Sequence, residues 1–316
     1  MTRPQHVLCI GECMAELAPL DMVGDYRLGY AGDTFNTAWY LRQLNPDQDV
    51  SYLSAVGCDA ISADMLRFMA EAGIGTDHIA RCPGHSVGLY MISLIDGERS
   101  FSYWRDTSAA RLLARDETAM IAAIDAADLV YFSGITLAIL SEVARERLLR
   151  VLQDARAAGR TIAFDPNLRP GLWPDPKEMQ TAIMQGASVS DIVLPSFEDE
   201  AMHFGDPDPQ GTIARYAAAG ATVVIVKNGA DPVLALYDGA TLRVDVPKVG
   251  RVVDTTSAGD SFNAGFLTGW GETLPMAARV RRASAVAGQV VGGKGALVTL
   301  DDAALAAARA LSPVLT

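Results

Sequence analysis

Short apolar runs alternate with longer amphipathic segments along most of this chain. Each apolar run has the length of a buried strand, and the amphipathic segments carry apolar residues at helical spacing. Strands that alternate with helices form βαβ units, whose strands lie parallel in one sheet. The pattern therefore predicts an α/β fold in which helices flank a doubly wound, mostly parallel sheet. We expect strands at residues 6–10, 50–56, 128–134, 161–165, 191–195 and 222–227, and helices at residues 34–44, 63–71 and 141–158.

Two segments, residues 12–31 and 87–105, break this alternation and look extended. The second contains Asp96-Gly97, a turn signal between two alternating runs, and so predicts a hairpin. Aromatic and polar residues share one face of these runs, as in a small sheet that closes as a lid over a polar ligand. A sheet that packs against a partner subunit explains the pattern equally well, and one sheet can serve both purposes.

Composition limits the class of protein. A chain of 316 residues that is 50% apolar can bury a large core, and we expect a single domain over residues 1–316 with the lid strands inserted in it. The formal net charge of -12 argues against nucleic acid or an anionic membrane as a partner. Four cysteines without a CxxC pair indicate neither a zinc site nor a disulfide framework. With no leader pattern and no apolar span of membrane length, a cytoplasmic location is expected.

The segment DTTSAGDSFNAGF, residues 254–266, places a carboxylate beside a turn of small residues. Ser257, Ala258 and Gly259 carry little side chain, so an anion can approach their backbone amides at the start of a helix. Asp260 would then lie within reach of a hydroxyl group and could act as a general base. A helix cap is the alternative role for this aspartate.

This segment is similar to the C-terminal signature of the PfkB (ribokinase-like) carbohydrate kinases, with Ser257 where the family usually has glycine. The resemblance implies a ribokinase-like fold, ATP and Mg²⁺ as cofactors, and Asp260 as the base that deprotonates the sugar hydroxyl. It also implies that the turn over residues 257–259 and Asn263 contact the nucleotide. A monovalent cation near Asp254 and Thr256 is implied only by family analogy.

The segment AGDTFN, residues 31–36, matches the family's N-terminal glycine motif, with Ala31 in place of the first glycine. Its carboxylate and amide lie at a strand-to-helix junction, where they could bind vicinal sugar hydroxyls. Capping of the helix by Asp33 or Thr34 is the alternative. The resemblance implies that the substrate-binding residues here are Gly32, Asp33, Thr34, Phe35 and Asn36.

A wider resemblance, over nearly the full chain, is to the members of this family that phosphorylate 2-keto-3-deoxygluconate. It implies that Tyr90, Tyr103 and Arg105 contact a keto-deoxy sugar acid, with Arg105 near the carboxylate. An arginine on an exposed strand is otherwise usually just solvated. The segments that carry this resemblance are residues 11–17, 88–92, 98–111, 132–141 and 164–173.

The segment FDPNLRPGLW, residues 164–173, follows a predicted strand and is too rich in proline and glycine to be helical. It is therefore expected to be a loop at the carboxyl end of a strand, where open α/β sheets bind ligands. Asn167 and Arg169 project from it. The resemblance gives Asn167 a nucleotide contact and Arg169 a catalytic role that bridges phosphate and substrate, while a structural ion pair is the alternative for Arg169.

Two further segments concern the nucleotide. In LPSFEDE, residues 194–200, many family members have an N-x-x-E motif that organises magnesium, but this chain has Ser196 and Asp199 at those positions. Asp199 could act on the metal through water, and a solvated acidic helix start competes with that role. In VIVKNGADP, Lys227 and the turn over residues 229–231 (Gly229, Ala230 and Asp231) are predicted to bind nucleotide phosphates, because the family has K-x-G here.

The resemblance thus implies an ATP-dependent kinase that acts on the terminal hydroxyl of 2-keto-3-deoxygluconate. Its partners would be this sugar acid and the nucleotide, with a homo-oligomer formed through the lid. A neutral-sugar kinase such as a fructokinase, and a catalytically silent sugar-acid sensor, remain alternatives. A Rossmann dehydrogenase fits the strand-helix alternation but needs a GxGxxG after the first strand, and that motif is missing. Whether the galactonate epimer is accepted stays open.

Overall fold

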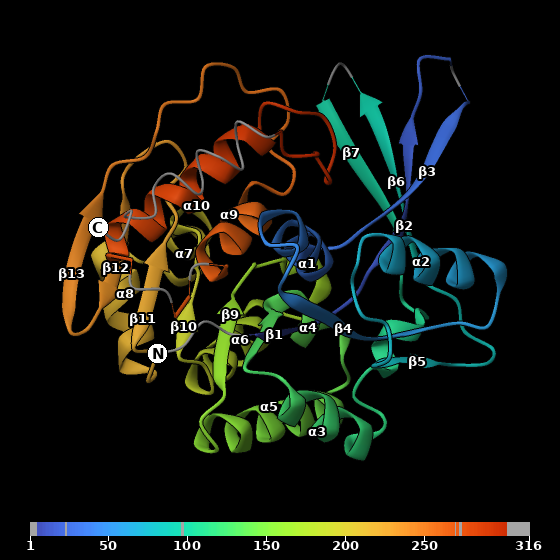
Figure 1. Cartoon of the computed structure of the whole chain (residues 1–316), viewed down its shortest axis with the longest axis horizontal. Helices are drawn as coiled ribbons and strands as arrows, with labels where there is room; N and C mark the ends of the chain where they lie inside the picture. The colour runs from blue at the N-terminus through green and yellow to red at the C-terminus, as the bar shows by residue number, and fades with distance from the viewer. Residues whose placement is uncertain (1–4, 23, 96–97, 269, 272–273, 302–316) are drawn as a thin grey trace.

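The computed structural model describes residues 5–22, 24–95, 98–268, 270–271 and 274–301. Its main sheet has the strand order β13-β12-β11-β10-β9-β8-β1-β4-β5 (Figure 1). In this sheet, β11, β10, β9, β8, β1, β4 and β5 pair in parallel, each with the next. β12 and β13 extend the sheet beyond β11 with antiparallel pairing. The strands are β1 (His6–Ile10), β4 (Asp49–Val56), β5 (Ile79–Arg81), β8 (Leu129–Ser133), β9 (Thr161–Asp165), β10 (Ile192–Val193), β11 (Val223–Val226), β12 (Val233–Tyr237) and β13 (Ala240–Val244).

Helices cover both faces of this sheet because successive side chains of a strand point to opposite faces. In β1, Val7 and Cys9 belong to one buried cluster, and Leu8 and Ile10 to another. The first cluster includes side chains from α1 (Asp33–Leu44), α2 (Ala60–Glu71), α9 (Ala258–Leu267) and α10 (Met276–Val290). The second contains α3 (Glu117–Ala126), α4 (Gly134–Ile139), α5 (Glu142–Ala157), α6 (Pro176–Ser188) and α8 (Pro209–Ala218). The predicted doubly wound α/β fold is confirmed.

Side-chain caps explain where two helices begin. The Asp59 carboxylate accepts the backbone N–H of Ser62 at 3.0 Å. This bond starts α2 at Ala60, three residues before the predicted start at residue 63. The Ser141 hydroxyl caps α5 in the same way by accepting the N–H of Ala144, so the predicted first residue of this helix is its cap.

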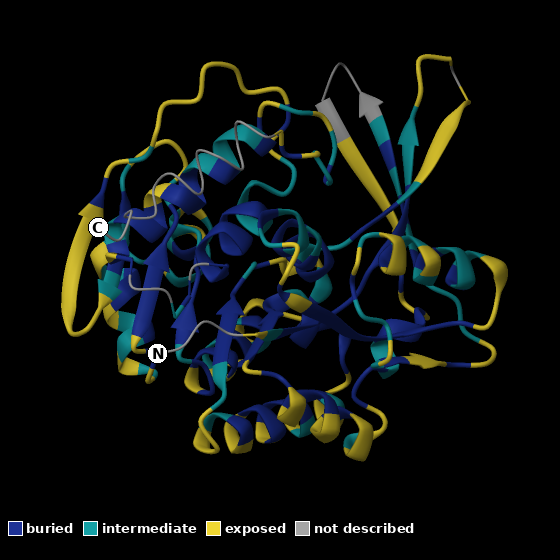
Figure 2. Ribbon diagram, viewed as in Figure 1, coloured by how far each residue is buried: buried dark blue, intermediate teal, exposed yellow. Residues whose placement is uncertain are grey.

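A small sheet projects from the main body, with the strand order β3-β2-β6-β7 (Figure 1). It consists of β2 (Met14–Pro19), β3 (Tyr26–Ala31), β6 (Gly88–Ile95) and β7 (Glu98–Trp104). Both segments predicted to be extended therefore form a second sheet, and β6 and β7 pair antiparallel as a hairpin. The Asp96-Gly97 turn lies outside the described residues. The central strands of the main sheet are buried and its edge strand β13 is largely exposed, whereas the small sheet is largely intermediate or exposed (Figure 2).

The four cysteines are free thiols: Cys9, Cys13 and Cys82 are buried, and Cys58 is exposed. Among the described helices, we find none whose length and apolarity would suit it to crossing a bilayer.

Candidate active site

Three segments that are far apart in the sequence meet beyond the carboxyl ends of the central strands. They are the start of α1, the loop that follows β9 and the start of α9. α1 packs against α9, and Asn36 of α1 bonds the first turn of α9. Because ligands of open α/β sheets bind at this edge, the predicted motifs lie where a substrate would be expected.

Asp260 is the third residue of α9 and does not cap the helix. The N-cap is Ser257, which has φ 61 and ψ 14 and makes no side-chain capping bond. This left-handed conformation explains why glycine is common here in the family that the signature resembles. Asn36 Nδ2 donates to Asp260 Oδ2 and to Ser257 Oγ, each at 2.8 Å. The Asn36 amide therefore fixes the carboxylate against the turn.

Asp260 has an altered acidity. Although the residue as a whole is only partly buried, its carboxyl group is withdrawn from water, and this desolvation raises its pKa to about 7. The neighbouring Asp33 carboxylate raises the pKa further, while the bond from Asn36 opposes the shift. A carboxylate that gains a proton near neutral pH suits general-base chemistry.

Asp33 is the first residue of α1 and does not cap it, since Gly32 occupies the N-cap position without a side-chain bond. Asn167 Nδ2 donates to Asp33 Oδ2 at 2.7 Å. Thr34 bonds a buried tyrosine hydroxyl, and both Thr34 and Phe35 are fully buried. Of the residues predicted to bind substrate in this motif, Thr34 and Phe35 thus have side chains in the core and could offer a ligand only backbone atoms.

A buried network follows β9 and β11, and its central residue was missed in the sequence. Lys227 Nζ donates to Asp165 Oδ2 at 3.0 Å and to Asn263 Oδ1 at 3.2 Å. Asn263 Nδ2 donates to Asp165 Oδ2 at 2.6 Å and to the Tyr131 hydroxyl at 3.0 Å. Asp165 therefore orients two residues predicted to bind nucleotide. Its position at the end of an apolar strand was the sequence signal that could have identified Asp165.

The first turn of α7 (Phe197–Phe204) carries three acidic residues, of which Asp199 and Glu200 lie near arginines. The side chain of Glu200 is buried and accepts bonds from Arg215 and Tyr216, which leaves it turned toward α8. Asp199 Oδ2 lies 3.9 Å from Arg169 Nη1. Burial raises the pKa of Asp199, and Arg169 opposes that shift. Asp199 thus faces the loop after β9, whereas Glu200 does not.

The remaining nucleotide motif forms the expected turn. Gly229 has φ 57, and Asp231 N donates to the carbonyl of Asn228 at 2.9 Å. Ser196 is the N-cap of α7 and makes no side-chain capping bond. The backbone of Ser196 forms a parallel bridge with that of Lys227, so Ser196 lies at the edge of the sheet where β11 ends. Gly229, Ala230 and Asp231 follow Lys227 closely and lie at the same edge.

Asp254 is engaged by protein donors. Its Oδ1 accepts bonds from the N–H and hydroxyl of Thr256, at 3.1 and 2.7 Å, and its Oδ2 accepts the N–H of Gly295 at 2.7 Å. The monovalent cation stays a prediction. In the described part of the chain, no group of three or more His, Cys, Asp or Glu side chains is arranged to hold a metal.

The small sheet offers two different faces. Tyr90, Phe101 and Tyr103 lie on one face, with ring centroids 5.9 to 6.2 Å apart. The Tyr90 hydroxyl donates to the buried Glu16, and Tyr90 packs with Ala296, next to the Gly295 that bonds Asp254. This face therefore packs on the segment after α10 that also bonds Asp254.

Arg105 is not a solvated surface arginine. It follows β7, its side chain is buried, and its Nη2 donates to the carboxylate of Glu12. Glu12 and Glu16 carry no recognisable signal in the sequence, because only the folded chain brings them to Arg105 and Tyr90.

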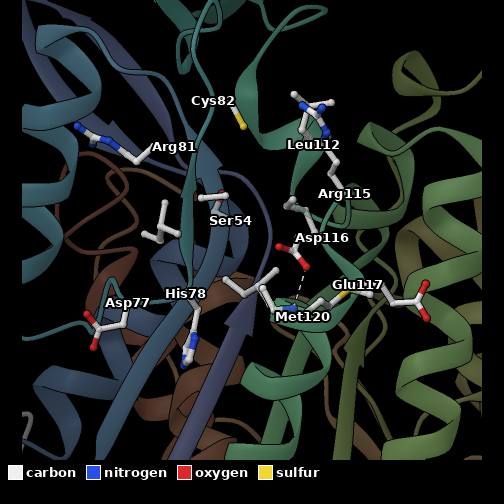
Figure 3. A pocket seen from close by; sticks show the side chains of 15 residues that line it. Ser54, Asp77, His78, Arg81, Cys82, Leu112, Arg115, Asp116, Glu117 and Met120 are labelled. Atoms are coloured by element: carbon white, nitrogen blue, oxygen red, sulfur yellow. Dashed lines mark hydrogen bonds between the residues drawn. The ribbon is translucent and has the colours of Figure 1, made fainter.

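A separate cavity of about 580 Å³ lies between β5 and the start of α3 (Figure 3). Its lining includes Ser54, Cys82, Asp116 and Met120. The Asp116 carboxylate accepts the N–H of Ala119 and caps α3, as the dashed line shows (Figure 3). None of the predicted site residues lines this cavity, so it is distinct from the site at the carboxyl edge of the sheet.

Residues 4–303 match the sequence model that describes the pfkB family of carbohydrate kinases. The chain belongs to this family. It is 37% identical to a 2-dehydro-3-deoxygluconokinase of Dickeya dadantii, over 94% of this chain and 98% of that protein. A protein of the same name from Haemophilus influenzae is 38% identical, over 93% and 96%. The crystal structure of a fructokinase with bound ATP from Xylella fastidiosa has a TM-score of 0.82 at 25% identity, covering 97% of this chain and 98% of that one. The family resemblance that the sequence motifs of this chain indicated is thus confirmed.

Proposed function

We propose that this pfkB-family kinase transfers the γ-phosphoryl group of ATP to the terminal hydroxyl of 2-keto-3-deoxygluconate, which is also called 2-dehydro-3-deoxygluconate. The names of the two relatives at 37% and 38% identity support this substrate. The observation that carries the chemistry is Asp260, a desolvated carboxylate with a pKa of about 7, held beside the turn at the start of α9.

In the proposed reaction, Asp260 accepts the proton of the terminal hydroxyl. The hydroxyl oxygen then bonds the γ-phosphorus, the bond from that phosphorus to the bridging oxygen breaks, and ADP leaves. The backbone amide of Gly259 lies in the first turn of the helix, where no intrahelical acceptor is available to it. The amide of Ala258 donates to the carbonyl of Thr255 at 3.2 Å and would share that hydrogen with a ligand. Both amides would stabilise negative charge on the transferred group.

ATP and Mg²⁺ are supported by family membership, and the chain offers suitable groups. Lys227 and the turn at residues 229–231 would contact the nucleotide, together with Asn167, Arg169, Ser196 and Ser257. Asn263 is fully buried and would act by holding Lys227. Mg²⁺ would neutralise phosphate charge, with Asp199 acting on it through water. The Asp199 carboxylate retains acceptor capacity, because its cation partner lies 3.9 Å away.

For the substrate, Gly32, Asp33 and Asn36 would bind hydroxyl groups. The aromatic face of the small sheet would close over the sugar as a lid, with Tyr90 and Tyr103 against it. Arg105 would contact the carboxylate and Arg169 would bridge substrate and phosphate.

A neutral-sugar kinase is the second candidate, and one observation favours it. Arg105 already has a carboxylate partner in Glu12, so its charge is partly neutralised before any sugar acid binds. A catalytically silent sensor remains the third candidate.

The test is ADP release measured with 2-keto-3-deoxygluconate, its galactonate epimer, fructose and 3-deoxyfructose, in which a hydroxymethyl group replaces the carboxylate. We expect the acid to give the highest kcat/KM. In Arg105→Gln the acid should lose about 2 kcal/mol or more of apparent binding, while 3-deoxyfructose changes much less. Faster turnover of fructose in the natural protein would favour the neutral-sugar kinase, and absence of turnover on all four would favour the sensor.

We further propose that residues 1–316 act as one kinase domain and that two copies associate through the outer face of the small sheet. Strand pairing places Leu17, Leu28, Leu89, Met91 and Trp104 on that face, opposite Tyr90. Leu28 and Trp104 are 46% and 56% exposed, and exposed apolar surface of this kind suits a second copy of the chain. The cytoplasmic location stays a prediction.

A further inference from the structure

We propose that Glu12 is the counter-charge that sets the affinity of the site for the carboxylate of a sugar acid, by holding and partly neutralising Arg105. This inference rests on the proposed function, since it assumes that Arg105 faces the acid group of the substrate. Glu12 would act through Arg105 and is thus a positioning residue.

The pair lies at the base of the small sheet. Glu12 belongs to the link of residues 11–13 between β1 and β2, and Arg105 directly follows β7. The side chain of Glu12 is 0% exposed and that of Arg105 is 7% exposed. Their bond therefore joins the point where the chain enters the small sheet to the point where it leaves.

The chain is shaped to admit this pair. A Cβ atom on Gly88 would lie 2.8 Å from Glu12 Oε1 and 3.3 Å from Arg105 Cβ. A Cβ atom on Gly32 would lie 2.1 Å from the backbone carbonyl oxygen of Glu12. Two glycines thus leave room around Glu12, and one of them directly precedes Asp33 in the predicted substrate motif.

The pair is not saturated by the described residues. Arg105 uses Nη2 for Glu12, while its Nε and the second carboxylate oxygen of Glu12 are buried and have no hydrogen-bond partner in that part of the chain. A guanidinium carries five N–H donors and can bind two carboxylates on different edges. Arg105 therefore keeps the capacity to bind a substrate carboxylate while Glu12 holds it.

The charges then determine selectivity. A sugar acid that reaches Arg105 also meets the negative charge of Glu12, which weakens its binding. A neutral sugar is not affected by either charge to the same degree. The difference in affinity between acid and neutral ligands thus depends on the pair and not on Arg105 alone.

The test compares Glu12→Gln with Glu12→Asp by titration calorimetry, using 2-keto-3-deoxygluconate and 3-deoxyfructose. Removing the charge in Glu12→Gln should lower the Kd of the acid at least about 3-fold and leave the Kd of the neutral sugar unchanged. Glu12→Asp keeps the charge and should keep the natural acid-to-neutral ratio. A purely structural role gives the opposite order, because glutamine is nearly isosteric with glutamate and aspartate is shorter.

A remote control is Glu178→Gln, which removes the carboxylate partner of Arg145 at 2.9 Å and should leave both affinities unchanged. If Glu12→Gln does not fold, Arg105→Gln is compared with the double variant Glu12→Gln/Arg105→Gln. The second change should then restore acid affinity at least about 3-fold, since the unpaired charge of Glu12 is gone.

An unchanged acid-to-neutral ratio in Glu12→Gln, or in the double variant relative to Arg105→Gln, would overturn the role of Glu12 while the kinase assignment stands. A natural protein that binds neither ligand, or prefers the neutral sugar, would overturn the proposed substrate and this inference together.

Discussion

Asn36 orients the carboxylate of Asp260 with a neutral amide, and so adds no positive charge that would lower its pKa strongly. Desolvation then dominates, and the carboxyl group titrates near neutral pH. The same amide bonds Ser257, so the proposed base and the turn are held by one side chain.

Asp260→Asn should lower kcat by at least about 10²-fold with little change in KM, because general-base catalysis contributes roughly 10² to 10⁴. Steady-state ADP release measures both constants. Since asparagine is nearly isosteric with aspartate, a matching circular dichroism spectrum serves as the control for folding. Near-normal turnover in this variant would refute the assignment of the base.

Asp260 should also make stability depend on pH. Its pKa is about 7 in the folded chain and about 3.9 in an unfolded one. The folded state therefore binds this proton more tightly, so the group contributes stability below pH 4 that is lost as the pH rises through 7. Asp260→Asn carries no charge and should melt about 1–3 °C above the natural protein at pH 8. This advantage should shrink at pH 5, and calorimetric scans at the two pH values would reveal a contrary sign.

At the scale of elements, β9 and β11 are joined at their carboxyl ends by the ion pair of Asp165 and Lys227, whose side chains are 6% and 10% exposed. Asn263 of α9 bonds both residues. One buried network thus connects two strands to the helix that carries Asp260, and it sets where these elements lie relative to one another.

Lys227→Met should destabilise the fold by about 3 kcal/mol, because it leaves the Asp165 carboxylate buried without its cation. Urea unfolding measures the loss. Adding Asp165→Asn should recover part of it, since the uncompensated charge disappears. The exposed pair of Arg150 and Glu117, 2.8 Å apart, provides the comparison: Arg150→Met should leave the urea midpoint nearly unchanged. Equal losses in the two single variants would contradict the role given to burial.

At the scale of the whole molecule, the small sheet stands apart from the helices that cover the main sheet (Figure 1). Its outer face carries Leu17, Leu28, Leu89, Met91 and Trp104, and its other face carries Tyr90, Phe101 and Tyr103. Under the proposed function, one face would join a second copy while the other would close over the sugar.

Leu28→Lys should shift the chain from dimer to monomer, because a charge in a shared apolar interface is desolvated without a partner. Light scattering coupled to gel filtration measures the mass. Val143→Lys places the same charge at a residue of α5 that is 65% exposed and should leave the mass unchanged. A natural protein that is already monomeric at micromolar concentration would rule out this interface.

Local patterns predicted the fold class. Alternating apolar runs predicted the main-sheet strands β1, β4, β8, β9, β10 and β11 but not β5, β12 or β13. Asp260 was found through a signature in which the turn and the proposed base are adjacent in sequence. Glu12 pairs with a residue 93 positions away, and Asp165 pairs with one 62 positions away. Such contacts depend on how the strands are ordered in space, which no local pattern specifies. The burial of Thr34 and Phe35 likewise follows from the direction in which α1 packs.

Cys58 gives the molecule a built-in attachment point for a spectroscopic probe. Of its four thiols, this one alone is exposed, so a maleimide dye should label the natural chain once. The preceding residue, Gly57, lies against the backbone of His85, in the segment that leads into β6. A fluorophore there would sense the base of the small sheet, and its emission could report in real time whether that sheet moves when sugar and nucleotide are added.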